Sequence, residues 1–245
     1  IDFKFSDALN SADNLITFKQ VVKSIAARNG LFASFAPKPL PDKSGSGLHI
    51  NISLLQNGHN VFRLGGRDHS KAAEAFVAGV LQKISEITAF LNPLPNSYER
   101  LGVCEAPRYV SWSYGNRSQL IRIPADNDER MRMELRSPDP ATNPYLAFAL
   151  IISAGFYGME NNLTLPESIN EDLYTADENV TGKLPRLPEN LGHALKLAEK
   201  SDFVRSVLDE KVLESYIRLK NIELQSFNAA ADKRNYFMEN YFKVL

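Results

Sequence analysis

The sequence predicts an α+β protein in which an antiparallel sheet is flanked by helices. Strand-like and helix-like segments interleave along the chain, and several strand-like segments are joined by connections too short for a helical crossover. The chain has 245 residues, of which 44% are hydrophobic, so it can bury a substantial core without disulfides or a structural metal.

Alternating apolar and polar residues indicate the strands. The predicted strands are residues 1–5, 31–36, 48–55, 109–114, 119–124 and 130–136. Asn57-Gly58 predicts a turn after the third of them. The chain begins at Ile1, inside the first predicted strand, so we interpret it as processed or truncated.

Apolar residues at helical spacing predict the helices. The first is expected between Ser11 as its N-cap and Gly30 as its stop, followed by helices over 72–91 and 143–160. Residues 163–188 resemble a loop because prolines punctuate them. From residue 189 onward the chain is expected to be helical in at least two pieces, including a long helix near 210–228.

The composition excludes several classes of protein. The chain has 28 Lys and Arg residues and 29 Asp and Glu residues. This balance argues against non-specific electrostatic binding of nucleic acid or acidic lipid. No apolar run approaches the roughly 18 residues of a membrane helix. The single cysteine, Cys104, excludes an intrachain disulfide and suits a reducing compartment. We expect a cytoplasmic protein with neither nucleic-acid nor membrane partners.

The strand over 48–55 has one polar and one apolar face. His49, Asn51 and Ser53 share the polar face, which suits a metal or a phosphate, although an ordinary solvated strand has the same pattern. Before the strand, Gly45 and Gly47 would let the backbone approach a ligand closely, or would simply form a flexible connection. They are not a Walker motif, because no Gly-Lys-Ser/Thr follows.

Arginine is concentrated in the middle of the chain. Between residues 100 and 136 there is no lysine, although the chain has 14 of each. The arginines of this window are Arg100, Arg108, Arg117, Arg122, Arg130, Arg132 and Arg136. Arginine is preferred where carboxylate or phosphate is recognised bidentately. The segment therefore predicts an anion-binding site.

Arg132, Glu134 and Arg136 share one face of the last predicted strand. They could form a cross-strand ion-pair ladder. Alternatively, the arginines hold anionic oxygens while Glu134 ligates a divalent metal that bridges them. Glu105 lies in an apolar, proline-bounded loop and could be either a general base or an exposed loop carboxylate.

Several stretches together resemble the catalytic domain of type I glutamine synthetase. They are Ala33–Pro39, Gly45–Leu54, Asn96–Leu101, Glu105–Pro107, Asn116–Ser118, Ile121–Pro124, Arg132–Pro140 and Asn143–Leu146, and their order and spacing cover nearly the whole chain. The resemblance implies a guanido-kinase-like fold, with residues 166–245 as a loop plus a helical C-terminal segment. It also implies ATP-dependent ligation of ammonia to L-glutamate through γ-glutamyl phosphate, with Mg²⁺ or Mn²⁺.

The resemblance assigns roles position by position. His49 and Glu134 match metal ligands, and Glu105 matches the loop carboxylate that closes the site and accepts a proton. Arg117 matches the arginine that stabilises the transferring phosphoryl group. The glutamate contacts would be Gly45, Arg100 and Arg136. The nucleotide and phosphate contacts would be Asn51, Ser53, Arg122 and Arg132.

The sequence also departs from the family pattern. The segment between Arg100 and Glu105 is one residue shorter than in the best-studied members, and Ser44 stands where they have Asn. Tyr174 is a weak local match to a tyrosine that some members adenylylate, and we interpret it as an exposed loop residue.

The largest expected departure is at the N-terminus. Residues 1–245 are interpreted as a catalytic domain that lacks the family's β-grasp domain and its first metal-binding strands. We therefore expect the isolated chain not to make glutamine at a useful rate, and the parent enzyme to form stacked hexameric rings. The alternatives are a γ-glutamyl ligase for an amine or polyamine, and a non-catalytic scaffold of the same fold.

Overall fold

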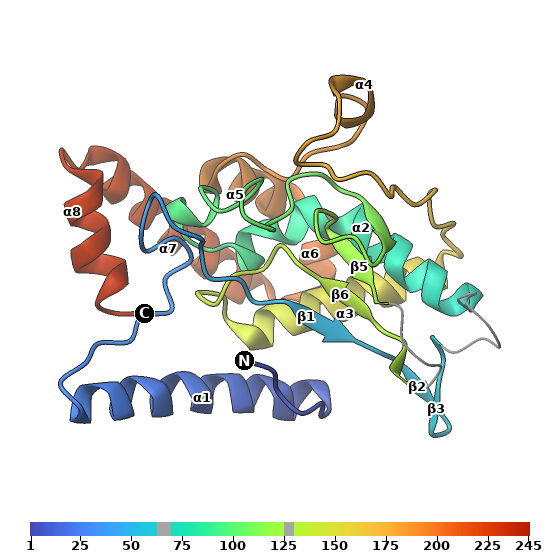
Figure 1. The fold of residues 1–245 in the computed structure, drawn as a ribbon, viewed down its shortest axis with the longest axis horizontal. Helices are drawn as coiled ribbons and strands as arrows, with labels where there is room; N and C mark the ends of the chain where they lie inside the picture. Colours follow the sequence, from blue (N-terminus) through green and yellow to red (C-terminus); the bar gives the residue numbers. More distant parts are fainter. Residues whose placement is uncertain (63–69, 125–129) are drawn as a thin grey trace.

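The computed structural model describes residues 1–62, 70–124 and 130–245. A four-stranded sheet lies at its centre, in the order β1-β6-β5-β4 (Figure 1). The strands are β1 (Ile50–Ile52), β4 (Trp112–Tyr114), β5 (Ile121–Ile123) and β6 (Met133–Leu135). Each lies within a segment predicted to be a strand, and the predicted α+β class is confirmed.

One strand pairing differs from the prediction. β6 runs antiparallel to both β1 and β5, as expected, but β4 and β5 are parallel. Gly115 takes a left-handed backbone conformation (φ 76°) directly after β4. Residues 115–120 then return the chain to the start of β4 instead of forming a hairpin. The short connection had predicted an antiparallel pair, and that prediction is wrong for β4 and β5.

A small hairpin extends from the end of the sheet. β2 (Leu55–Gln56) pairs with β3 (His59–Asn60) in antiparallel fashion. Asn57 and Gly58 between them both have positive φ, at 53° and 79°. This is the geometry that an Asn-Gly hairpin turn requires, so the predicted turn is confirmed.

Two long helices bury the apolar face of the sheet. α2 (Lys71–Leu91) and α3 (Pro144–Glu160) share one core cluster with residues of all four strands. The helices cross closely because glycines meet there: a Cβ on Gly79 would lie 2.1 Å from the Ala154 carbonyl oxygen and 2.6 Å from the Gly158 nitrogen. Gly155 similarly leaves room for the Phe76 ring. Both helices lie close to their predicted bounds.

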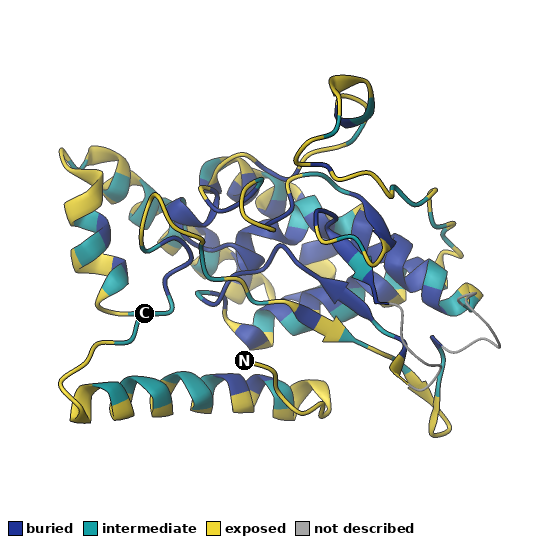
Figure 2. Cartoon of the chain, viewed as in Figure 1, coloured by how far each residue is buried: buried dark blue, intermediate teal, exposed yellow. Residues whose placement is uncertain are grey.

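The first helix, α1 (Ala8–Arg28), runs along the edge of the molecule and contacts α3. Asp7, not the predicted Ser11, is its N-cap and accepts a hydrogen bond from the Asn10 backbone nitrogen at 3.0 Å. The helix therefore begins one turn earlier than predicted. Figure 2 shows its outer face exposed.

The predictions of strands at 1–5 and 31–36 are wrong. Neither segment forms a strand or pairs with any strand that the structure describes. Their aromatic residues pack on other rings instead. Phe3 lies 5.1 Å from Phe18 and Phe35 lies 5.9 Å from Phe18, both measured between ring centroids. Phe32 packs on Phe242. Alternation alone does not form a strand when no neighbouring strand is available to pair.

The rest of the chain after α3 is a long loop followed by helices. The elements are α4 (Glu178–Thr181), α5 (Leu191–Lys200), α6 (Asp202–Val207), α7 (Glu210–Ala229), α8 (Lys233–Phe237) and a π-helix, η3 (Met238–Phe242); a short 3₁₀ helix, η1 (Pro95–Ser97), precedes the sheet's middle strands. α7 confirms the predicted long helix. α4 stands out from the body at the top of Figure 1.

The long loop is held to the sheet by side chains of the β4 region. The Trp112 indole nitrogen donates to the Pro166 carbonyl oxygen at 2.7 Å. The Asn116 amide donates to the Asn170 and Glu171 carbonyl oxygens, each at 2.9 Å. Within the described residues, no helix is both long enough and apolar enough to span a bilayer.

Candidate active site

The polar face of the sheet carries a row of charged and polar side chains. The register places Asn51 of β1 and Arg122 of β5 on either side of Glu134 in β6. His49, Asn51 and Ser53 are exposed, whereas the alternating Ile50 is buried. The predicted division of this strand into two faces is confirmed.

Glu134 is the centre of the row. Arg136 Nη1 donates to its Oε1 at 2.6 Å, and His49 Nδ1 lies 3.0 Å from the same oxygen. Arg122 Nε donates to Oε2 at 2.6 Å. Burial would raise the pKa of Glu134, but hydrogen bonds from His49 and Arg122 and the charge of Arg136 lower it to about 2. The carboxylate is therefore ionised at neutral pH.

Arg136 connects the sheet to the loop over 101–106, which we call the Glu105 loop. The Arg136 side chain is only 2% exposed. Besides Glu134, its guanidinium donates to the Arg117 carbonyl oxygen at 3.1 Å and to the Glu105 carbonyl oxygen at 3.2 Å. Burial lowers the pKa of Arg136, and the Glu134 charge opposes that effect. Arg136 thereby positions two predicted catalytic residues relative to the sheet.

The Glu105 loop is a tight and exposed turn. The Gly102 backbone nitrogen donates to the Ala106 carbonyl oxygen at 2.8 Å, which closes the loop. Cys104 and Glu105 have positive φ values of 49° and 66°, a conformation that costs non-glycine residues energy. The Glu105 carboxylate lies 3.4 Å from Arg117 Nη1, and both side chains are more than half exposed.

The glycine loop lies directly over Arg100. A Cβ on Gly47 would come within 2.7 Å of Arg100 Nη2, and one on Gly45 within 2.5 Å of the Pro37 carbonyl oxygen and 3.1 Å of the Arg100 side chain. The two glycines therefore let the loop backbone lie close to Arg100 and Pro37. Arg100 is buried and donates to the Ser137 and Arg136 carbonyl oxygens at 2.7 and 3.1 Å.

Arg100 is supported by a buried carboxylate, Asp139, which is not among the site residues predicted from the sequence. Asp139 is fully buried, and its charge raises the pKa of Arg100, which burial lowers. Its oxygens accept hydrogen bonds from the Asn92 amide and the Ala141 backbone nitrogen, both at 3.0 Å. Burial raises the pKa of Asp139 itself. Asp139 and Asn92 are remote in sequence, so strand periodicity gave no signal of their meeting.

The remaining predicted residues lie at the rim of the row. Arg132 Nε donates to Asn51 Oδ1 at 3.0 Å. Ser53 lies on the same exposed face as Asn51, one residue beyond β1. Tyr174 lies 38% exposed in the long loop, and partial burial raises its pKa to about 12. The structure thus brings the sheet residues and the Glu105 loop together, while Ser53 and Tyr174 lie at the edges.

A divalent cation would find only part of a ligand set here. His49 and Glu134 have suitable donor chemistry. Both oxygens of Glu134 already accept from guanidinium groups. Among the described residues, moreover, no three His, Cys, Asp or Glu side chains converge. His49 and Glu134 could therefore supply only part of the ligand set of such an ion.

Comparison with known proteins places this geometry in a family. The model of the glutamine synthetase catalytic domain matches residues 1–239. Glutamine synthetase of Clostridium saccharobutylicum is 42% identical over 98% of this chain, and that of Methanosarcina mazei is 44% identical over 94%. These regions are 55% and 52% of the two relatives, so the chain spans about half their length.

Solved structures support the same family assignment. GmaS in an ADP complex superimposes with a TM-score of 0.85 at 31% identity, over 97% of this chain and 56% of that one. GmaS without ligand gives a TM-score of 0.84 at 32% identity. The chain belongs to the glutamine synthetase catalytic-domain family.

Proposed function

We propose that this chain supplies the phosphate-binding and glutamate-binding part of an ATP-dependent ligase that joins ammonia to the γ-carboxylate of L-glutamate. One observation carries the proposal. The side chains of Arg122 and Arg136 converge on the single carboxylate of Glu134, and Arg136 also connects them to Glu105 and Arg117. Family membership and the ADP complex of a similar structure support it.

The proposed role of each arginine follows from how exposed its side chain is. Arg122 and Arg132 reach the sheet's open face and would hold nucleotide phosphates through charge-assisted hydrogen bonds. Arg117, whose side chain is 62% exposed, can turn toward the charge that develops on a phosphoryl group in transfer. Arg136 and Arg100, which are buried, would act from fixed positions on the glutamate carboxylates.

The chemistry requires two steps. The glutamate γ-carboxylate oxygen attacks the γ-phosphorus of ATP, which releases ADP and forms γ-glutamyl phosphate. The ammonia nitrogen then attacks the γ-carbonyl carbon, and the C–O bond to phosphate breaks. The nitrogen must lose a proton in this step, and the Glu105 carboxylate is placed on an exposed loop where it could accept that proton.

The binding half of the proposal is tested with ADP in the full-length protein that contains this chain. We expect R122Q and R132Q each to weaken ADP binding by about tenfold, since each removes a charge-assisted contact. R218Q, an exposed arginine of α7, is the control and should leave affinity unchanged. Undiminished ADP binding in both R122Q and R132Q would refute the nucleotide assignment.

The catalytic half is tested by measuring product from glutamate, ATP and either ammonia or methylamine. Turnover with ammonia that falls at least about a hundredfold in E105Q would support the general-base role. Preference for methylamine would instead assign an amine ligase. If ADP binds but no acceptor yields product, the family fold serves here as a non-catalytic scaffold.

A further inference from the structure

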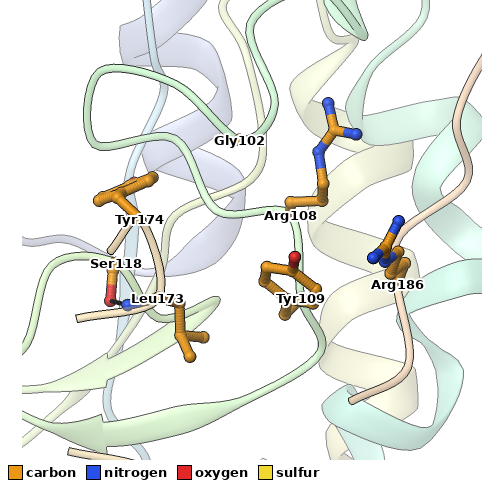
Figure 3. A pocket seen from close by; sticks show the side chains of 7 residues that line it. All are labelled: Gly102, Arg108, Tyr109, Ser118, Leu173, Tyr174 and Arg186. Carbon is orange, nitrogen blue, oxygen red and sulfur yellow. Dashed lines mark hydrogen bonds between the residues drawn. The ribbon is translucent and has the colours of Figure 1, made fainter. Parts of the chain in front are cut away.

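A pocket beside the Glu105 loop has no role in the proposed reaction. Its volume is about 280 Å³, and Figure 3 shows two arginine side chains around it. The lining residues are Gly102, Arg108, Tyr109, Ser118, Leu173, Tyr174 and Arg186. Pockets for small molecules begin at about this size.

Backbone hydrogen bonds hold the two arginine-bearing segments side by side. The Val110 nitrogen donates to the Pro185 carbonyl oxygen at 2.8 Å, and the Leu187 nitrogen donates to the Arg108 carbonyl oxygen at 2.9 Å. Tyr109 and Arg186 form an antiparallel bridge between them. The wall of the pocket is therefore fixed by main-chain contacts and does not depend on side-chain packing alone.

Within residues 1–62, 70–124 and 130–245, the two arginines of this wall have no counterion. Arg108 Nη2 donates to the neutral Leu101 carbonyl oxygen at 2.9 Å, and the Arg186 guanidinium lies 5.4 Å from the centre of the Tyr109 ring. Across the part of the chain that the structure describes, neither arginine has a carboxylate within ion-pair distance. Glu189 lines a neighbouring hollow of about 10 Å³ together with Arg108 and Arg186, without an ion pair to either.

The other walls offer groups for the rest of a small ligand. The Tyr109 and Tyr174 rings and the Leu173 side chain provide apolar surface next to phenolic hydroxyls. Ser118 is already committed, because its hydroxyl accepts from the Leu173 nitrogen at 3.0 Å and bonds Asn116 at 2.9 Å. Two guanidinium groups beside tyrosines favour an oxyanion on a compact organic body.

We propose that this pocket binds a small organic anion that carries a phosphate or carboxylate group, with Arg108 and Arg186 holding the anionic oxygens. The occupant would also lie against the base of the Glu105 loop. Gly102 lines the pocket and closes that loop through its hydrogen bond to Ala106, and Arg108 holds Leu101 at the loop's start. Occupancy would therefore stabilise the Glu105 loop.

The test measures binding without ATP, glutamate or ammonia, so its failure would leave the proposed reaction untouched. Phenyl phosphate, inorganic phosphate and benzoate are each titrated into the full-length protein, and the arginine side-chain Nε–H resonances are followed by NMR. We expect the Arg108 and Arg186 resonances to shift with phenyl phosphate or benzoate, and amide exchange of Gly102 to slow. The two organic probes distinguish a phosphate from a carboxylate ligand.

Variants separate this pocket from the Glu134 row. R186Q should weaken binding about tenfold, as expected for one lost charge-assisted contact, and R186K should restore part of it. R108Q should do the same. R205Q is the matched control, because Arg205 is also exposed and also donates to one backbone carbonyl, that of Glu199 at 2.7 Å. R205Q should bind normally.

The proposal is overturned if R186Q and R108Q bind all three probes as tightly as the unaltered protein does. If binding then disappears in R122Q, the anion belongs to the Glu134 row. The Arg186 side chain makes no hydrogen bond to the main chain of the described residues, so R186Q still tests the proposal if R108Q fails to fold.

Discussion

Glu134 in β6 and Arg136, directly after that strand, form a 2.6 Å ion pair between side chains that are both at most 5% exposed. Two further side chains, Arg122 and His49, reach the same carboxylate. Glu134 is thus the shared counterion of a largely positive row. Glu134 and Arg122 lie in β6 and β5, while His49 directly precedes β1 and Arg136 directly follows β6, so the sheet register sets their geometry.

Removing the charge of Glu134 should destabilise the fold strongly. E134Q takes the 2.6 Å ion pair from the buried Arg136 guanidinium and leaves it only the Glu105 carboxylate at 3.9 Å, and breaking a buried pair in this way costs about 3 kcal/mol or more. Urea denaturation measures the change. R117Q is the control, because it breaks an exposed pair with Glu105 and should cost less than about 1 kcal/mol. Equal effects of the two variants would contradict the central role of Glu134.

The same carboxylate predicts a pH dependence of stability. Its folded pKa of about 2 lies below the ordinary value of 4.5, so its contribution is complete above about pH 5 and is lost as the pH falls toward 2. The loss should be about 3 kcal/mol, at about 1.4 kcal/mol per unit. Urea denaturation, in buffers that contain EDTA to remove divalent metal ions, measures the free energy of unfolding. The difference in this free energy between the unaltered protein and E134Q should become smaller as the pH falls from about 5 to 2.

Asp139 does not disturb that comparison. Its pKa is raised by burial, so it acts with the opposite sign, but it is present in both proteins and cancels in their difference. A difference that stays constant between pH 5 and 2 would show that Glu134 titrates normally.

The glycine loop should tolerate no side chain at Gly47. In G47A the new Cβ would meet Arg100 Nη2 at 2.7 Å, and Arg100 is held by two carbonyl oxygens. We expect a loss of about 1–3 kcal/mol in thermal unfolding. G192A is the control, since the nearest atom there is a Leu224 methyl group at 3.2 Å, at the end of a side chain that can move, and Gly192 lies in α5, where alanine favours the helix by up to about 1 kcal/mol. That change should not destabilise the protein, and an equally harmless G47A would disprove the close contact.

The crossing of α2 and α3 makes a similar prediction in the core. An isolated helix gains about 1 kcal/mol when Gly becomes Ala, but G79A would place a methyl group 2.1 Å from the Ala154 carbonyl oxygen. We expect the protein to lose at least about 3 kcal/mol, because both contacting atoms belong to a backbone. Q82A, on the exposed face of α2, should change stability by less than about 0.5 kcal/mol in the same measurement.

The sequence predicted those parts of the site that lie along one strand. His49, Asn51 and Glu134 were placed on polar faces because side chains alternate within a strand, and that rule needs no tertiary information. The resemblance to the family then connected the strands. The roles given to these residues stay predictions, since geometry alone assigns no ligand.

Tertiary contacts explain what could not be predicted. Asp139 and Asn92 meet beneath Arg100 only because α2 ends beside the chain that leaves β6. The segments over 1–5 and 31–36 have the alternation of strands, yet Phe3 and Phe35 find their partner on α1. The return of residues 115–120 to a parallel pairing depended on one left-handed glycine, Gly115.

The hydrogen bond from Trp112 to Pro166 has a practical consequence. Trp112 is the chain's single tryptophan, and its indole joins β4 to the long loop that carries Tyr174. Release of that loop would expose the buried indole to water and move its fluorescence emission to longer wavelength. The protein therefore contains an intrinsic optical probe of loop docking, which can be read without a label while ADP or a pocket ligand is added.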